Sequence, residues 1–190
     1  PFKNFKKIKP KNAIKHPNWK MGSKISIDSA TLMNKVFEVI EAQRIFNLDI
    51  NKFKIYIHPK SYVHAVIKFA NGLTKILVHD TNMTIPIFNI IYEESKKSIV
   101  TKKIDFSIIN NLNFQESNEI KFPSLKLLKK FSNKISLYET VLVAANDELV
   151  HLFLSGQINF IEIYKYLKKI LELKEFKKYK QIMPKNYEQI

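Results

Sequence analysis

Glycine occurs only three times in this chain of 190 residues, at positions 22, 72 and 156. Folds that hold a nucleotide on a backbone loop need closely spaced glycines, because only glycine lets the main chain come so near a phosphate. The sequence accordingly contains no dinucleotide-binding, P-loop or nucleophile-elbow motif. Cysteine is absent too, which excludes disulfide bonds and thiolate metal sites within the chain.

The net charge of +15 raises the question of nucleic-acid binding. Of the 32 basic residues only Arg44 is an arginine, although arginine is the side chain best suited to bidentate contacts with bases and phosphates. The lysines are spread along the whole chain, and they share A/T-rich codons with the abundant Ile, Asn and Phe. Genome composition therefore accounts for the charge. A salt-dependent nucleic-acid binder is the rival interpretation, and attraction for phosphorylated small molecules fits better.

Apolar residues make up 45% of the chain, enough for one sizeable domain or two small ones. Lys, Asn or Glu interrupts every apolar run before it reaches membrane-spanning length. The basic segment 1–16 is not followed by the apolar stretch of a secretory signal. We therefore expect a soluble protein with no membrane partner, in a reducing compartment.

The first half of the chain combines one long helix with strands. After a short extended piece at 24–27, Asp28 and Ser29 offer N-cap chemistry for a helix whose apolar positions recur at intervals of three and four. Three strand-like runs follow at 53–59, 62–70 and 73–79, and the last begins directly after the turn pair Asn71-Gly72. This order predicts an α+β fold with a small, mostly antiparallel three-stranded meander.

The second half is predicted to be helical. Pro86 and the apolar residues around it indicate a short helix, and 93–121 is polar and irregular, as in a linker. From Pro123 onward the period is that of helices, with a stop signal at Gly156. We therefore expect three parts: 1–92, a linker at 93–121, and a C-terminal helical bundle at 122–190.

A strip of polar side chains is predicted on the first long helix. With Asn34 as origin, Glu38 falls about 40° and Glu41 about 20° away, and Lys35 borders the strip. Oxygen ligands of this kind suit Mg²⁺ or Mn²⁺, and a helix start near Ser29 would favour an anion. The alternative is that the strip is simply a solvated helix face with a spaced ion pair.

The remaining candidates are less specific. The segment 16–22 contains the single tryptophan, Trp19, in a loop bounded by Pro17 and Gly22. A lone tryptophan is most often a core or interface residue. The five histidines show no paired metal-ligand spacing, and packed neutral rings are the expected state of His58 and His64.

A long motif carries a resemblance to a known family. The run at 16–42 reads HPNWKMGSKISIDSATLMNKVFEVIEA, and it is followed by IHPKSYVHAVIKFANG at 57–72 and AANDELVHLFLSGQINFIEI at 144–163. Together these runs resemble 1-deoxy-D-xylulose 5-phosphate reductoisomerases over nearly the whole chain. The segment NMTIPI at 82–87 is similar to the family's DMR-x-PI, with Asn82 and Thr84 as departures.

The resemblance implies residue roles. It assigns the substrate phosphate and nearby hydroxyls to His16, Ser29, Asn34 and Lys35, and it gives Glu38 as a metal ligand. Lys35, Glu38 and Glu41 are the implied catalytic group. Trp19 and Met21 are implied to form a flap that closes over the substrate, with Met83 and Gly22 on the cofactor side.

The resemblance also implies an activity. It is the metal-dependent rearrangement and NADPH-dependent reduction of 1-deoxy-D-xylulose 5-phosphate to 2-C-methyl-D-erythritol 4-phosphate, in non-mevalonate isoprenoid synthesis, with Mg²⁺ or Mn²⁺. Residues 1–92 would be part of a catalytic domain, and the NADPH-binding domain and two further acidic ligands would lie outside this sequence. A homodimer in the bacterial cytoplasm or a plastid-type organelle is expected. An inactive binding or dimerisation module is the alternative.

Overall fold

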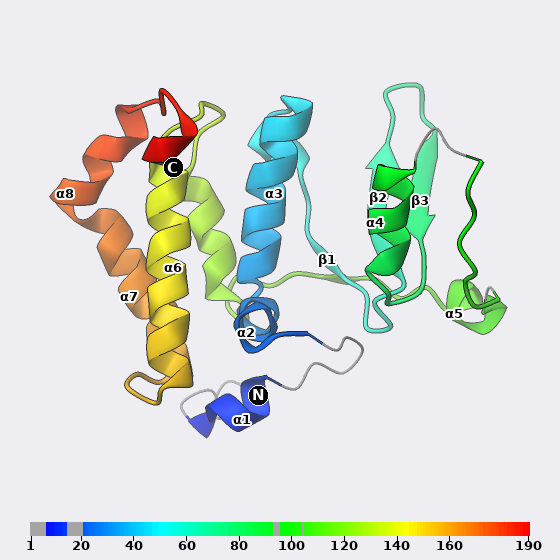
Figure 1. The fold of residues 1–190 in the computed structure, drawn as a ribbon, viewed down its shortest axis with the longest axis horizontal. Coiled ribbons are helices and arrows are strands. Elements are labelled where there is room, and N and C mark those ends of the chain that lie inside the picture. Colours follow the sequence, from blue (N-terminus) through cyan, green and yellow to red (C-terminus); the bar gives the residue numbers. More distant parts are fainter. Residues whose placement is uncertain (1–6, 15–20, 93–95, 104) are drawn as a thin grey trace. The chain divides into compact units, whose positions relative to one another are not determined.

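The computed structural model describes residues 7–14, 21–92, 96–103 and 105–190, and Figure 1 shows its ribbon. These residues form two compact units. Unit 1 contains the described residues at 7–14, 21–55 and 117–190, and unit 2 contains those at 56–92, 96–103 and 105–116. Among the described residues, no helix is long and apolar enough to cross a membrane.

Unit 1 is helical. Its first part contains α1 (Pro10–Ala13), α2 (Ser23–Thr31), α3 (Met33–Phe46) and the 3-10 helix η2 (Ile50–Lys52). Its second part contains η3 (Pro123–Lys130), α6 (Tyr138–Leu154), α7 (Phe160–Glu172), α8 (Lys174–Lys177), η4 (Lys178–Gln181) and η5 (Tyr187–Gln189). α6 packs on α7, α2 on α6, and α3 on η3. The predicted helices of the C-terminal part are confirmed.

One apolar core joins both parts of unit 1. It is formed by side chains that are almost completely buried: Ile27, Met33, Val36, Leu127, Leu142, Leu149, Val150, Phe153, Ile163, Leu167 and Leu171. The expected boundaries between three parts, at 92 and 122, differ from the two units, because unit 1 combines residues 21–55 with residues 117–190. The apolar face of the first long helix is buried against the C-terminal helices, and composition alone does not reveal that partner.

The α2–α3 joint differs from the prediction. Residues 24–27 are helical rather than extended, and Asp28 and Ser29 lie inside α2 instead of capping a helix. α2 begins after Gly22, whose carbonyl accepts hydrogen bonds from the backbone N–H and the hydroxyl of Ser26, at 3.1 and 2.9 Å. The chain breaks at Leu32, which has a left-handed conformation with φ of 56°. The capping prediction was wrong because Asp28 is used in the interior.

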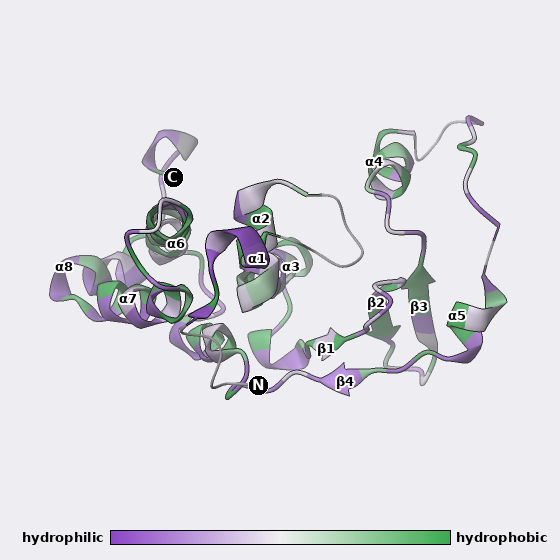
Figure 2. Ribbon diagram, turned by 90° about the horizontal axis from the view of Figure 1, so that it is seen from below, coloured by the Kyte–Doolittle hydropathy of each residue, from purple (hydrophilic) through white to green (hydrophobic). Residues whose placement is uncertain are grey.

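Unit 2 contains two small antiparallel sheets and two helices. β1 (Tyr56–Ile57) pairs with β4 (Gln115–Glu116), and β2 (Val63–Lys68) pairs with β3 (Thr74–Val78). The helices are α4 (Thr84–Ile91) and α5 (Phe106–Asn110). Figure 2 shows the apolar character of β2.

The predicted hairpin and short helix are confirmed, and Gly72 has the positive φ of 89° that the turn requires. The three-stranded meander is wrong, because β1 pairs with the polar β4 rather than with β2. The chain leaves unit 1 at Ile55 and returns at Ser117, whose N–H donates to the Ile55 carbonyl at 3.3 Å.

The core predicts a sharp contrast between two neighbours on α6. Leu142 is completely buried, whereas the side chain of Val143 is 44% exposed. Leu142→Ala should lower the free energy of unfolding by about 2–5 kcal/mol, because it removes buried methyl groups and leaves a cavity. Val143→Ala, the matched control, should change it by no more than about 0.5 kcal/mol. Urea unfolding midpoints of the two variants give the comparison, and equal losses would contradict the assigned core.

Candidate functional site

The polar strip predicted on the first long helix is present in the first two turns of α3. The Lys35 ammonium donates to both carboxylate oxygens of Glu38, at 2.6 and 2.9 Å. The amide nitrogen of Asn34 is 3.5 Å from Glu38 Oε1. The Lys35 and Glu38 side chains are 38% and 52% exposed, so this ion pair adds only about 0–1 kcal/mol to stability. The cluster is therefore accessible to a ligand at little cost.

Asn34 has an unsatisfied atom within this cluster. Its amide oxygen is buried and has no hydrogen-bond partner among the described residues. A buried acceptor without a donor costs about 1–3 kcal/mol, which is unusual for a residue that only covers a helix. This oxygen is an acceptor to which a ligand could donate a hydrogen bond.

Ser29 lies close to the strip because of the joint at Leu32. The Leu32 N–H donates to the Ser29 carbonyl at 3.1 Å, and α3 begins one residue later. Thr31 stabilises the same joint, with its hydroxyl donating to the Ile27 and Asp28 carbonyls at 3.0 and 3.1 Å. Ser29 thus belongs to the end of α2, next to the positive N-terminal end of α3. Ser29 and Asn34 thus lie on the two helices that meet at this joint, and the predicted capping geometry is wrong.

The described residues do not form a complete metal site. Glu38 and Glu41 are exposed on α3. The described ranges contain no group of three or more His, Asp and Glu side chains that could hold a metal ion. The carboxylate of Glu38 is a suitable hard-oxygen donor for Mg²⁺ or Mn²⁺, but it is a single ligand.

Of the candidate residues in the segment 16–22, the structure describes Met21 and Gly22. His16 and Trp19 lie outside the described residues. Met21 is half-buried at the start of α2, and Gly22 has φ of −64°, which any residue can adopt. Gly22 serves as the N-cap residue of α2. Met83, in unit 2, precedes α4 and is 56% exposed.

Three histidines, His58, His64 and His79, form packing contacts in unit 2. The rings of His64 and His79 stack with centroids 3.5 Å apart, and His64 Nε2 is 3.1 Å from the His79 carbonyl. His58 lies 5.7 Å from the Phe114 ring, and its Nδ1 is 3.3 Å from the Asn113 carbonyl. Sequence reasoning did not find the stacked pair, because it depends on the register of β2 against β3.

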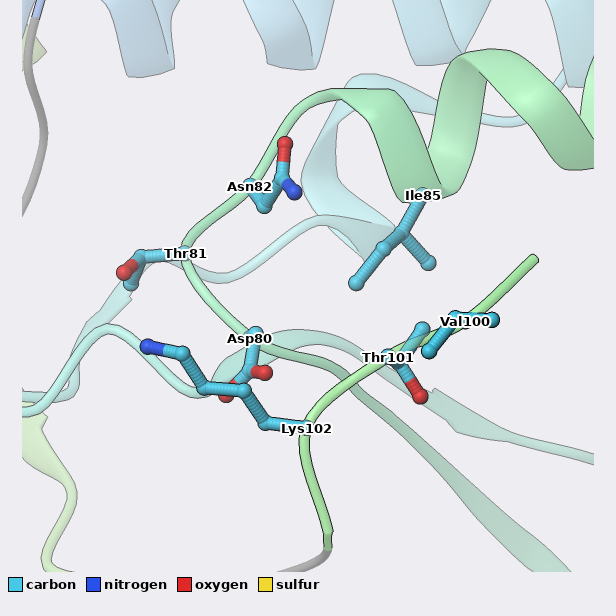
Figure 3. Close-up of a pocket in the computed structure, with 7 residues that line it drawn as sticks. All are labelled: Asp80, Thr81, Asn82, Ile85, Val100, Thr101 and Lys102. Atoms are coloured by element: carbon cyan, nitrogen blue, oxygen red, sulfur yellow. The ribbon is translucent and has the colours of Figure 1, made fainter.

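A pocket of about 180 Å³ lies elsewhere in unit 2 (Figure 3). It is lined by Asp80, Thr81, Asn82, Ile85, Val100, Thr101 and Lys102. Asn82 is engaged in capping α4, since its side-chain oxygen accepts from the Thr84 N–H at 3.0 Å. The pocket contains none of the predicted site residues.

Sequence reasoning also missed a polar cluster between α2 and α6. The buried carboxylate of Asp28 accepts a hydrogen bond from the Asn146 amide at 2.8 Å and pairs with Lys24 at 2.8 Å. Lys24 also pairs with Asp147 at 2.9 Å. Partial burial lowers the pKa of Lys24, but its hydrogen bonds to Asp147 and Asp28 outweigh this and the pKa is raised. The ammonium of Lys24 therefore stays charged.

The single arginine has a structural role. Arg44 Nη1 donates to the Asn133 carbonyl at 2.9 Å, and Nη2 donates to the Lys134 carbonyl at 2.8 Å and pairs with Glu139. These contacts connect the last turn of α3 to the segment before α6. The one guanidinium of the chain is thus occupied within unit 1, which agrees with the argument against nucleic-acid recognition.

Two family models match the chain. A model described as the 1-deoxy-D-xylulose 5-phosphate reductoisomerase C-terminal domain matches residues 1–46, and one described as the DXP reductoisomerase C-terminal domain matches 79–190. The 1-deoxy-D-xylulose 5-phosphate reductoisomerase of Pelagibacter ubique is 54% identical over 100% of this chain and 49% of its own length. That of Persephonella marina is 38% identical over 100% of this chain and 50% of its own. The chain therefore spans about half the length of these relatives.

Solved structures of the same enzyme share the fold. The reductoisomerase from Zymomonas mobilis in complex with NADPH has a TM-score of 0.81 at 28% identity, covering 98% of this chain and 46% of that one. A reductoisomerase in complex with NADPH, fosmidomycin and magnesium has a TM-score of 0.83 at 32% identity, covering 94% and 44%. The mostly helical architecture with small antiparallel sheets matches these structures. On its sequence, its fold and its motif, the chain belongs to the 1-deoxy-D-xylulose 5-phosphate reductoisomerase family.

Proposed function

We propose that this chain supplies the phosphate-binding corner and one metal ligand of a 1-deoxy-D-xylulose 5-phosphate reductoisomerase. The complete protein would rearrange 1-deoxy-D-xylulose 5-phosphate and reduce the product with NADPH to 2-C-methyl-D-erythritol 4-phosphate. The observation that carries the proposal is the contact of Lys35 with Glu38, next to Asn34, on an exposed strip of α3. It joins an ammonium for a phosphate and a carboxylate for a cation within one helical turn.

The phosphate would be held at the joint between α2 and α3. Ser29 offers a hydroxyl, Asn34 an amide and Lys35 an ammonium, and the N-terminal end of α3 adds a partial positive charge. Binding of the phosphate at this corner would orient the sugar carbons along the strip, which lowers the entropic part of the barrier.

The metal would be bound in part by Glu38. Magnesium is named in the complex of a solved relative, and the carboxylate of Glu38 suits Mg²⁺ or Mn²⁺. When bound, such an ion acts as a Lewis acid on the substrate oxygens. Lys35 holds the Glu38 carboxylate in place in this structure, and Glu41 would approach the sugar hydroxyls one turn further along α3. The resemblance assigns the other ligands to sequence outside this chain.

Two segments would complete the site. His16, Trp19 and Met21 belong to the proposed flap, and the indole would exclude water while His16 contacts a polar group of the substrate. Met83 and Gly22 would lie on the side of the NADPH nicotinamide, and NADPH is the cofactor named in two solved relatives.

We further propose a homodimer formed through unit 2. Val66 and Ile76 are paired across β2 and β3 and are 51% and 46% exposed. A two-stranded hairpin is marginal alone, and a second copy would bury this apolar surface. The bacterial relatives make the cytoplasm the proposed location. The same apolar surface supports a second candidate function, in which the chain is an inactive dimerisation module.

Glu38→Gln in the full-length protein should lower kcat by about 100-fold or more, because a neutral amide binds Mg²⁺ or Mn²⁺ weakly. Glu148→Gln, at an exposed position of α6, is the control and should keep full activity. The measurement is NADPH oxidation with 1-deoxy-D-xylulose 5-phosphate at limiting Mn²⁺. Wild-type rates for Glu38→Gln would reject the metal assignment, and an inactive wild-type protein would favour the inactive module.

Trp19→Ala should raise KM for the sugar phosphate and lower kcat, each by about tenfold, because an open flap admits water and holds the substrate loosely. Trp19→Phe keeps an aromatic cover and should recover most of the rate. Steady-state kinetics with varied sugar phosphate separate the two parameters. An alanine variant that behaves like the wild type would remove the flap from the mechanism.

Val66→Lys should shift the protein from dimer to monomer, because it places a charge on the apolar hairpin face. Lys68→Glu, on the same strand, is the control for a charge change at an already charged position. Sedimentation velocity distinguishes the two states. A dimer that persists in Val66→Lys would show that the interface lies elsewhere.

A further inference from the structure

The most unusual interaction outside the proposed site is the buried carboxylate of Asp28. Asp28 is 2% exposed, and Asn146, which donates to its carboxylate, is completely buried. The partners are 118 residues apart in the sequence and join α2 to α6. Lys24 extends the contact, because it pairs with Asp28 and Asp147 and lies 5.5 Å above the Phe37 ring of α3. We call Lys24, Asp28, Asn146 and Asp147 the Asp28 clamp.

The clamp is a costly way to hold two helices together. Removing a carboxylate from water is unfavourable, and buried ion pairs often stabilise a fold no better than apolar packing would. Asn146 adds to this cost, because its amide oxygen is buried without a hydrogen-bond partner among the described residues. The clamp is therefore better explained by the defined position that it gives α2 than by a gain in stability.

The position that the clamp fixes is the proposed phosphate-binding corner. Ser29 follows Asp28 directly, and Leu32, with its left-handed backbone, connects Ser29 to the first turn of α3. Lys24 also reaches α3 through Phe37, which lies between Lys35 and Glu38 in the sequence. The clamp therefore contacts both helices that carry the proposed ligands, from the side of α6.

We propose that Lys24, Asp28, Asn146 and Asp147 are positioning residues for phosphate binding, through which α6 sets the geometry of Ser29, Asn34 and Lys35. This inference rests on the proposed function. It gives the C-terminal helices a role in substrate affinity, although none of the four residues would touch the substrate.

The test compares Lys24→Met with Lys24→Arg in the full-length protein. Lys24 is partly exposed, so Lys24→Met opens no cavity in the core but leaves the Asp28 carboxylate with only its Asn146 hydrogen bond, whereas arginine can again bridge Asp28 and Asp147. Lys24→Met should raise KM for 1-deoxy-D-xylulose 5-phosphate by about fivefold to tenfold with little change in kcat, since it weakens binding uniformly. KM for NADPH should stay constant, and Lys24→Arg should restore the substrate KM.

Arg44→Met is the matched control. It cuts a different polar connection, between the last turn of α3 and the start of α6, about ten residues and some 15 Å along α3 from Asn34. It should lower the melting temperature without changing KM for the sugar phosphate. If Arg44→Met raises this KM as much as Lys24→Met does, or if Lys24→Met leaves it unchanged, the positioning role is refuted.

Hydrogen exchange separates this inference from the proposed function. In the ligand-free protein, Lys24→Met should accelerate exchange of the backbone amides at 28–36, whereas Arg44→Met should leave them as in the wild type. Unchanged exchange at 28–36 in Lys24→Met refutes the clamp whatever the enzyme does. Accelerated exchange together with an inactive wild-type protein would instead refute the proposed function, and with it the link to phosphate.

Discussion

The left-handed backbone of Leu32 is the constraint on which unit 1 depends. A non-glycine residue with positive φ costs on the order of 1 kcal/mol, and it persists only where the surroundings enforce it. Here the surroundings are the core contacts on both sides, with Ile27 buried before the joint and Met33 after it. The break lets α2 pack on α6 while α3 packs on η3, which one continuous helix could not do.

The elements that local sequence determines were predicted well. Apolar residues at helical spacing gave α3, α6 and α7, and the pair Asn71-Gly72 gave the hairpin. Two of the failures involve distant partners. β1 pairs with Gln115–Glu116, a polar dipeptide without any strand pattern, and the N-cap prediction failed because Asp28 binds Asn146 instead of a helix end.

The candidate site likewise has a part that local sequence predicts and a part that depends on distant residues. Spacing along one helix was enough to place Asn34, Lys35 and Glu38 on a common strip, because a regular helix fixes their angles. The family motif then gave this strip a chemical meaning that spacing does not carry. The contribution of α6 was not predictable, since no local pattern marks Asn146 as the partner of a residue so far away. His16 and Trp19 lie outside the described residues, and the family motif is what assigns their roles.

The core of unit 1 is closed by segments from both ends of the chain, and this order has a consequence during synthesis. Asn146 leaves the ribosome 118 residues after Asp28. At about 5–20 residues per second, α2 and α3 wait roughly 6–24 s for the helix that covers them. During this interval Ile27, Met33 and Val36 are exposed on a nascent chain. The order of these segments along the chain thus creates a period in which chaperones have an apolar target, before unit 1 is closed.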